Sequence, residues 1–222
     1  MTNLFLFISF IFLNGFFLVF LYFDLKFRKV PMNFFKFSYI IAVVLNIIEY
    51  LFFFDKIAFF LFLKITILII VLFLSLILFF LKIVGGSDGK LIIFIFIVHP
   101  ILFLNLTIIF TFYLTFSLFF VIYFIMNWVN NNFLKNNYSF LLFFNSNSKI
   151  SVLKKVYIKI FYRFFNYSEL CDYMEGKYLI KSLNLIYNAR KNKFQTLCQI
   201  RPPLIITIIL TYYIIFYLNL VV

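Results

Sequence analysis

The sequence predicts an all-α integral membrane protein with about six transmembrane helices and a small cytosolic insertion between helices five and six. Hydrophobic residues make up 66% of the 222 residues and charged residues only 12%, about half of the charged share of a soluble domain. So few charges cannot cover a water-facing surface. The long apolar runs lack the alternation of a strand, so helices are expected to satisfy the backbone in lipid.

Six apolar segments account for the expected helices. The first starts at Leu4 with no basic residue before it and has no small-residue cleavage site, so we expect it to be retained as a span. Pro31 indicates that this span has ended, because the residue before a proline avoids helical conformations. Gly85 and Gly86 interrupt the apolar sequence before the fourth helix, and Pro100 predicts a kink within that helix. The expected helices cover residues 4–23, 34–54, 57–81, 90–104, 106–128 and 203–222.

The distribution of basic residues predicts the orientation of these helices. If the spans alternate, one side of the membrane receives the turns at 24–33 and 82–89 and the long stretch 129–202. That side, with the adjoining helix ends, carries eighteen of the 20 Lys and Arg residues, and only Lys56 and Lys64 lie elsewhere. By the positive-inside rule this side is cytoplasmic, and the amino terminus is expected outside the cell membrane.

A basic cytosolic insertion at 129–202 is expected between the five-helix membrane core at 1–128, which carries both candidate aspartates, and the sixth transmembrane helix at 203–222, which packs on that core. The start of the insertion is polar and turn-like in sequence: Asn130, Asn131, Asn132, Asn136 and Asn137. Further on, apolar and basic residues recur on two faces at helical spacing: Leu153, Val156, Ile160 and Phe164, and Lys155, Lys159 and Arg163. This pattern predicts an amphipathic helix on anionic lipid, with short strands as the alternative. The same topology explains the net charge of +13, so no nucleic-acid partner is expected.

Two of the seven acidic residues lie near the ends of predicted spans on the cytoplasmic side. Asp24 closes the first helix and Asp88 opens the fourth, 64 residues later. An ionisable residue near hydrocarbon costs a few kcal/mol (~3 at the bilayer centre, less near the interface), so its position points to function. If the two carboxylates meet, they cannot both ionise cheaply and they share one proton. Aspartic proteases use such a pair to activate water and to polarise the scissile carbonyl.

The residues around Asp88 favour a helix start. Gly85 and Gly86 allow backbone conformations that other residues avoid, and they allow another helix to approach closely. A helix N-terminus favours a carboxylate, whereas Asp24 lies at a helix C-terminus, where negative charge is disfavoured. We therefore expect Asp88 to carry the charge and Asp24 the shared proton. Taken alone, each aspartate also fits a structural role, Asp88 as a helix cap and Asp24 as a partner of a nearby basic residue.

The two aspartates lie in the segments FDLKFRKVPMN and IVGGSDGKLI, and ELCDYMEGKYL and QIRPPLIITIIL follow later in the chain. These four segments resemble the type IV prepilin and preflagellin (archaellin) peptidases, a family of GxGD-type membrane aspartic proteases. The first, which includes Arg28 and Pro31, is FDLKFRKVPMN, and it resembles their D-x-x-x-R-x-[IV]-P-N region. The second is IVGGSDGKLI, which resembles their G-G-x-D-x-K-[LA] segment. Two later segments, ELCDYMEGKYL and QIRPPLIITIIL, look like the L-x-E-G-[DK] stretch of archaeal members and the proline-bearing segment before the last helix. Ser87 stands where the class has its glycine, and Met32 separates Pro31 from Asn33.

The resemblance implies an aspartic endopeptidase of a compact archaeal-like form that needs no cofactor and no metal. Asp24 and Asp88 would be catalytic at the cytoplasmic membrane face, and the surrounding motif would be supplied by Gly85, Gly86, Ser87, Lys90, Arg28 and Pro31. The substrate would be a precursor pilin or archaellin, whose class III signal peptide is a short basic leader followed by a hydrophobic helix. Three acidic residues of the insertion are candidates to receive that leader: Glu169, Asp172 and Glu175.

A non-enzymatic multi-pass transporter or assembly subunit is the alternative. Glu49 and Lys64 lie inside the second and third spans, nearer the external side, where they are expected to pair, and with His99 they would line a polar path. His99 has no clustered ligands, so we expect a packed polar residue rather than a metal site. In a third possibility, cleavage within the membrane, the acids would lie at mid-helix depth. Cys171 and Cys198 form no C-x-x-C motif and are expected to be two cytosolic thiols.

Overall fold

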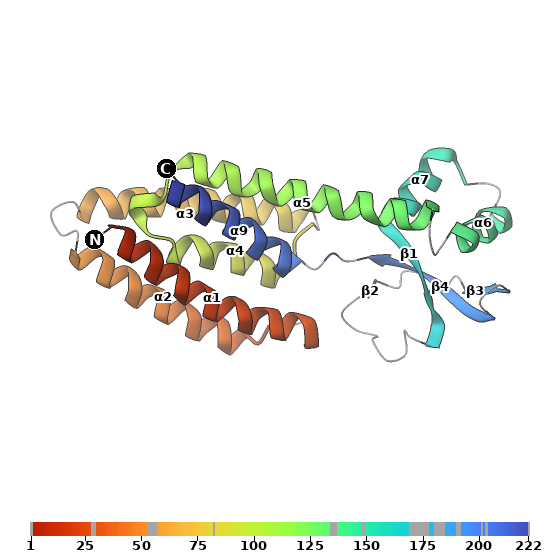
Figure 1. The fold of residues 1–222 in the computed structure, drawn as a ribbon, viewed down its shortest axis with the longest axis horizontal. Helices are drawn as coiled ribbons and strands as arrows, with labels where there is room; N and C mark the ends of the chain where they lie inside the picture. The colour runs from red at the N-terminus through yellow and green to blue at the C-terminus, as the bar shows by residue number, and fades with distance from the viewer. Residues whose placement is uncertain are drawn as a thin grey trace. The chain divides into compact units, whose positions relative to one another are not determined.

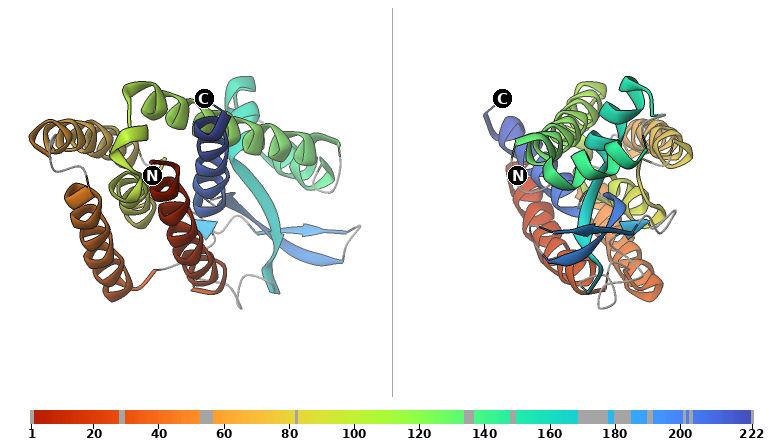
Figure 2. Two further views of the ribbon diagram at one scale, coloured as in Figure 1. Left: turned by 60° about the vertical axis from the view of Figure 1, so that its left-hand side comes forward. Right: turned by 90° about the vertical axis from the view of Figure 1, so that its right-hand side faces the viewer.

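The chain folds into two compact units, Met1–Phe116 with Pro203–Val222, and Ser117–Pro202. The first is a helical bundle, and the second combines helices with a small sheet (Figure 1 and Figure 2). The computed structural model describes residues 2–27, 30–52, 57–81, 83–133, 137–147, 150–168, 178–179, 185–189, 192–200, 202 and 204–221.

Within these residues, four helices are long and apolar enough to cross a membrane. They are α1 (Thr2–Phe27), α2 (Met32–Phe52), α3 (Ile57–Phe80) and α5 (Leu106–Phe133). The last helix, α9 (Leu204–Val221), is a shorter apolar helix. The prediction of a mostly helical membrane protein is therefore confirmed, and the first, second, third and fifth predicted spans are helices of spanning length.

The predicted span at 90–104 is not one continuous helix. In its place α4 (Gly86–Val98) has 13 residues, about 20 Å at ~1.5 Å per residue, whereas the hydrocarbon core of a bilayer is about 30 Å thick. The helix ends at His99, whose backbone is extended (φ −62°, ψ 131°), and a 3-10 turn, η2 (Ile101–Phe103), follows Pro100. Because the residue before a proline is disfavoured in a helix, the proline produces a helix end here instead of the predicted kink.

The buried centre of the helical unit is α4, which packs against α1, α2, α3 and α9. Buried side chains cover more than half of the helix circumference, at ~100° per residue: Leu91, Ile92, Phe94, Ile95, Phe96 and Val98. Ile93 and Ile97 on the remaining side are partly buried. A helix that is apolar all round belongs inside a bundle. The backbone groups at its two ends must therefore find partners within the protein.

The end of α1 and the start of α4 lie at the same end of this unit. Helices α1 and α2 run antiparallel, and α4 runs parallel to α2 (Figure 1). Two hydrogen bonds fix the register of the parallel pair: the Tyr39 hydroxyl donates to the Lys90 carbonyl at 2.9 Å, and the Asn46 amide donates to the Ile97 carbonyl at 3.1 Å. The antiparallel relation of α1 and α4 follows from these two directions.

The second unit packs two helices on an antiparallel sheet. The unit starts within α5, at Ser117. Its further described elements are α6 (Asn137–Ser146), α7 (Val152–Phe161), β1 (Tyr162–Asn166), β2 (Tyr178–Leu179), β3 (Leu185–Asn188) and β4 (Lys193–Ile200). The long strand β4 pairs with each of the other three strands. The core between helices and sheet contains Phe140, Phe143, Phe144, Ile158, Phe164 and Leu197. The insertion therefore contains the short strands expected as the alternative to an amphipathic helix, together with helices, so this unit is not all-α.

The predicted amphipathic helix ends before its last expected position. It forms α7, but β1 begins at Tyr162 and pairs with β4, so Phe164 is a strand residue in the core. Leu153, expected on the apolar face, is exposed. The ammonium groups of Lys155 and Lys159 lie over the ring of Phe144, 5.6 and 5.9 Å from its centroid. Tertiary pairing with β4 therefore overrides the helical spacing of the sequence.

The predicted turn at the start of the insertion is wrong for Asn130, Asn131 and Asn132, which lie within α5. Asn131 is fully buried, and its amide donates to the carbonyls of Lys159 and Tyr162, both at 2.7 Å. These carbonyls lie at the end of α7, where they have no partner within their own helix. An asparagine inside one helix therefore caps another helix.

Cys198 lies in β4 with 0% of its surface exposed, and burial raises the pKa of its thiol. The thiolate is the reactive form of cysteine. We therefore expect a maleimide at pH 7 to modify Cys198 at least about 10-fold more slowly in the folded protein than in denaturant. Cys171 lies outside the described residues, so a Cys171→Ser variant isolates the buried thiol for mass spectrometry. Equal labelling rates in the two conditions would contradict the prediction.

Candidate active site at the ends of α1 and α4

Asp88 caps the start of α4. Gly85 is the N-cap residue, with an extended backbone (φ −76°, ψ 162°), and its carbonyl accepts the first helical hydrogen bond from Gly89 N–H at 3.0 Å. The Oδ2 atom of Asp88 accepts a hydrogen bond from Gly85 N–H at 3.2 Å. This half-buried carboxylate therefore lies in the first turn of α4, where the helix dipole favours a negative charge.

Gly85 serves a close approach rather than an unusual backbone conformation. No glycine among the described residues has a positive φ, so the predicted conformational role of the two glycines is not found. A Cβ atom at Gly85 would lie 2.9 Å from Asp88 Oδ2 and would push the carboxylate off the cap. At Gly86 the nearest atom to such a Cβ would belong to Phe79, at an ordinary contact distance of 3.8 Å. The close approach therefore involves the aspartate and the first glycine.

Asp24 continues the buried face of α1. Leu13, Phe17 and Phe20 are buried at helical spacing, and Asp24 follows Phe20 by one turn. The residue is half-buried, and its Oδ2 atom is shielded from solvent. This carboxylate is held among protein groups near the end of α1 rather than in bulk water.

Phe94 connects α4 to this end of α1. Its ring centroid lies 5.5 Å from that of Phe16 and 6.1 Å from that of Phe20. Because the two helices are antiparallel, Asp24 lies about 6 Å beyond this contact along α1 and Asp88 about 9 Å beyond it along α4, at ~1.5 Å per residue. Around the α4 axis, Asp88 is about 120° from Phe94, so it lies on another side of α4 than the one that contacts α1, at the end where α4 begins. We call this end of the helical unit the Asp end.

The other motif residues are placed as follows. Pro31 opens α2, since its carbonyl accepts the N–H groups of Phe34 and Phe35 at 3.1 and 3.4 Å. Ser87 is half-buried in the first turn of α4. Several predicted residues lie outside the part of the chain that the structure describes, namely Arg28 and the acidic residues Glu169, Asp172 and Glu175.

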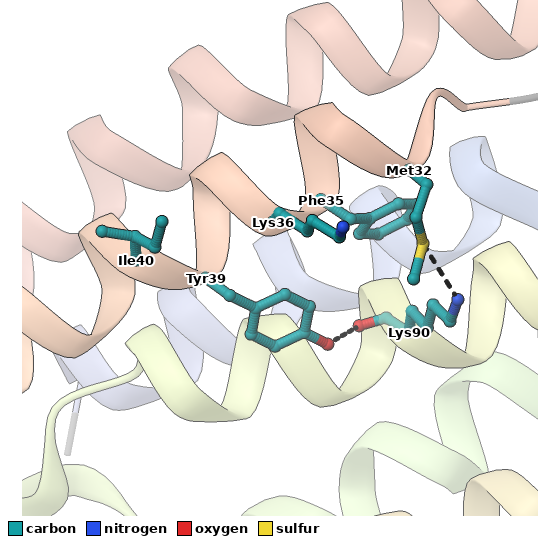
Figure 3. Close-up of a pocket in the computed structure, with 6 residues that line it drawn as sticks. All are labelled: Met32, Phe35, Lys36, Tyr39, Ile40 and Lys90. Carbon is teal, nitrogen blue, oxygen red and sulfur yellow. Dashed lines mark hydrogen bonds between the residues drawn. The ribbon is translucent and has the colours of Figure 1, made fainter.

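Lys90 lines an open pocket at the Asp end, between α2 and α4 (Figure 3). The pocket has a volume of ≈ 500 Å³, and its lining consists of Met32, Phe35, Lys36, Tyr39, Ile40 and Lys90. The backbone of Lys90 accepts the Tyr39 hydroxyl, and its ammonium group lies 3.4 Å from the Met32 sulfur. This pocket could not be predicted from the sequence, because its two walls are 51 residues apart at the Tyr39–Lys90 bond.

A second polar cluster lies at the opposite end of α4, where the helix is broken. Glu49 and Lys64 form the predicted ion pair, with a distance of 3.4 Å from Oε2 to Nζ, and they are 5% and 3% exposed. Both also bind the broken backbone: Glu49 Oε1 accepts Ile101 N–H at 2.7 Å, and Lys64 donates to the His99 carbonyl at 3.2 Å. The sequence predicted the ion pair but not these two hydrogen bonds to the backbone. The available signal was Pro100, which leaves backbone groups near it without helical partners.

His99 is a packed polar residue, as expected. Its Nδ1 atom lies 3.3 Å from the Tyr212 hydroxyl, the two rings meet edge to face, and the histidine is 2% exposed. Within the described part of the chain, no group of three or more His, Cys, Asp or Glu residues could hold a metal ion. The cluster at the break therefore satisfies backbone and buried charge, and the Asp end is the candidate active site.

The function of the chain is inferred from its own residues and their geometry. No protein-family model, curated protein or solved structure matches it.

Proposed function

We propose that the chain is a membrane aspartic endopeptidase of the prepilin and preflagellin peptidase type. The observation that carries the proposal is the position of Asp24 and Asp88, 64 residues apart in the sequence, near the same end of two neighbouring helices. The proposal includes a six-crossing topology in the cell membrane, in which α4 with η2 and α9 complete the set of spans. The amino terminus is then outside, and the Asp end faces the cytoplasm.

In the proposed mechanism the two aspartates handle one water molecule. The charged aspartate takes a proton from the water, whose oxygen bonds to the scissile carbonyl carbon, while the protonated aspartate donates its proton to the carbonyl oxygen. The C–N bond then breaks as the aspartate that took the water proton passes it to the leaving nitrogen. One hydroxyl of the tetrahedral intermediate returns its proton to the other aspartate, which gives a carboxylic acid and an amine. Asp88 is the charged partner because it lies in the first turn of α4, and Asp24 holds the proton near the end of α1.

The proposed substrate is a precursor pilin or archaellin with a basic leader and a hydrophobic helix. A hydrophobic helix of spanning length lies in the bilayer, so the junction with its polar leader emerges at the membrane boundary. Asp24 and Asp88 belong to helix ends rather than to helix centres, which suits a bond at that boundary. This depth also favours a leader peptidase over an enzyme that cleaves in the middle of the bilayer.

Cleavage of such a precursor by the purified protein tests the proposal. The full chain in detergent is incubated with a pilin-like precursor, and the products are identified by mass spectrometry. We expect one cut, at the junction of leader and hydrophobic helix. The control is the same precursor with a polar sequence in place of the hydrophobic helix, which should remain intact. If the purified protein is folded and helical but leaves the precursor with the hydrophobic helix uncut, the proposal is wrong.

The alternative, a transporter or assembly subunit with a polar path through Glu49, Lys64 and His99, has weaker support. Glu49 and Lys64 are bound to each other and to the backbone at the helix break. Moving an ion past them would leave a buried charge and two backbone groups without partners, which is costly. The cluster is therefore better explained as part of the fold.

A further inference from the structure

The pocket at the Asp end combines two positive charges with apolar walls. Lys36 comes from α2 and Lys90 from α4, and both side chains line the pocket (Figure 3). Neither ammonium group forms an ion pair with a carboxylate of the described residues. The hydrogen bond of Lys90 goes to the thioether of Met32, which is a weak acceptor. No carboxylate of the described residues therefore neutralises the two lysines beside this pocket.

The apolar part of the pocket continues along the face of a spanning helix. Met32, Lys36 and Ile40 follow one another at four-residue steps on α2, so they lie on one face. Ile40 is 64% exposed, and α2 is long and apolar enough to cross a membrane. The two lysines therefore lie near the end of a hydrophobic surface that leads away from them along α2.

We propose that this pocket binds an anionic phospholipid, with the phosphate between Lys36 and Lys90 and an acyl chain along Ile40. The positive charges of the two lysines match the negative charge of a phosphate. The apolar face of α2 beside them suits the hydrocarbon chain of the same ligand. The volume of ≈ 500 Å³ is within the usual range of about 300–1,000 Å³ for small-ligand pockets. The site shares Lys90 with the motif of the proposed peptidase but uses neither Asp24 nor Asp88, so lipid binding is measured separately from precursor cleavage.

Lipid binding to the full chain in neutral detergent tests this site. Native mass spectrometry compares the retention of phosphatidylglycerol, which is anionic, with that of phosphatidylcholine, which has no net charge. We expect the wild-type protein to retain phosphatidylglycerol preferentially. In the Lys36→Gln/Lys90→Gln variant its affinity should fall by about 10- to 30-fold, as expected for the loss of two lysines near an anionic headgroup. Phosphatidylcholine binding should not change.

Two further variants separate this site from general charge and from misfolding. Lys26→Gln removes an exposed lysine of the last turn of α1, outside the pocket, and should retain wild-type affinity. Met32→Glu keeps both lysines but offers Lys90 a carboxylate within the protein, and an acidic residue suits the first turn of α2. It should weaken phosphatidylglycerol binding without lowering the thermal stability.

Three results would overturn the proposal. One is an unchanged affinity in the double variant. Another is an equal loss in Lys26→Gln, because the preference would then reflect net charge alone. The third is complete displacement of the lipid by inorganic phosphate at the same concentration, because the pocket would then bind a soluble anion without using the apolar face. A loss of precursor cleavage in any variant bears on the peptidase proposal and leaves these lipid measurements unaffected.

Discussion

Replacing Asp88 or Asp24 with asparagine should slow precursor cleavage by about 10³-fold. Asparagine is nearly the same size, but it can neither take a proton from water nor hold the shared proton. At Asp88 the new side-chain oxygen can still accept Gly85 N–H, which lies 3.2 Å from Oδ2 in the wild type, so α4 keeps its cap. The loss of rate then reports the chemistry of the carboxylate rather than the folding of the helix.

Asp55→Asn is the matched control for these variants. Asp55 lies outside the described residues, and the sequence predicts it on the opposite side of the membrane. The same substitution there should leave the cleavage rate unchanged. Because the two aspartates act as one unit, the variant that lacks both should be about as slow as the slower single variant. A wild-type rate in either Asp24→Asn or Asp88→Asn would exclude that residue from the mechanism.

The amino-acid sequence is sufficient to predict the long helices of the membrane unit. In α1, α2, α3 and α5 a continuous apolar run of spanning length determines the structure without help from distant residues. The length of α4 could not be predicted in this way. Its break at Pro100 is stabilised by Lys64, 35 residues from the carbonyl that it binds, and by Glu49, 52 residues from the N–H that it binds. Such partners are known only after the helices have packed.

The insertion shows the same limit for strands. Helical spacing predicted one helix through Phe164, but Tyr162–Asn166 pairs with residues from Gln195 to Gln199 and is therefore a strand. The two strands bind each other's backbone groups along their shared edge, so a partner 29–37 residues away determines the local structure. The buried amide of Asn131 is a related case, because the carbonyls that it binds belong to the end of another helix.

For the candidate site, the sequence predicted the residue types and the helix end but not the geometry. Asp88 was expected at a helix N-terminus and lies there. The role of Gly85 differed, because a Cβ atom there would displace Asp88 Oδ2 from the cap, whereas no positive φ requires a glycine. The depth of Asp24 relative to Asp88 depends on aromatic contacts around Phe94. A single sequence contains no signal for such a register between helices.

Removing one member of the Glu49–Lys64 pair should destabilise the helical unit by about 3–5 kcal/mol, because the other charge stays buried without its counter-ion. In Lys64→Met, Glu49 is left with Ile101 N–H. In Glu49→Gln, the amide oxygen can still accept that N–H, but Lys64 is left with the His99 carbonyl. Unfolding of the purified variants in mixed detergent measures the free energy of unfolding. The exposed Lys26 provides the control, and Lys26→Met should change it by less than about 0.5 kcal/mol.

The double variant Glu49→Gln/Lys64→Met should lose less stability than the sum of the two single variants, because neither charge is then left unpaired. Additive losses would mean that the two side chains stabilise the break independently. The pair lies at the opposite end of α4 from Asp88, so the folded fraction of Glu49→Gln should cleave the precursor at the wild-type rate. If that folded fraction were inactive, the cluster at the helix break would belong to the mechanism, and its role would extend beyond satisfying the backbone at Pro100.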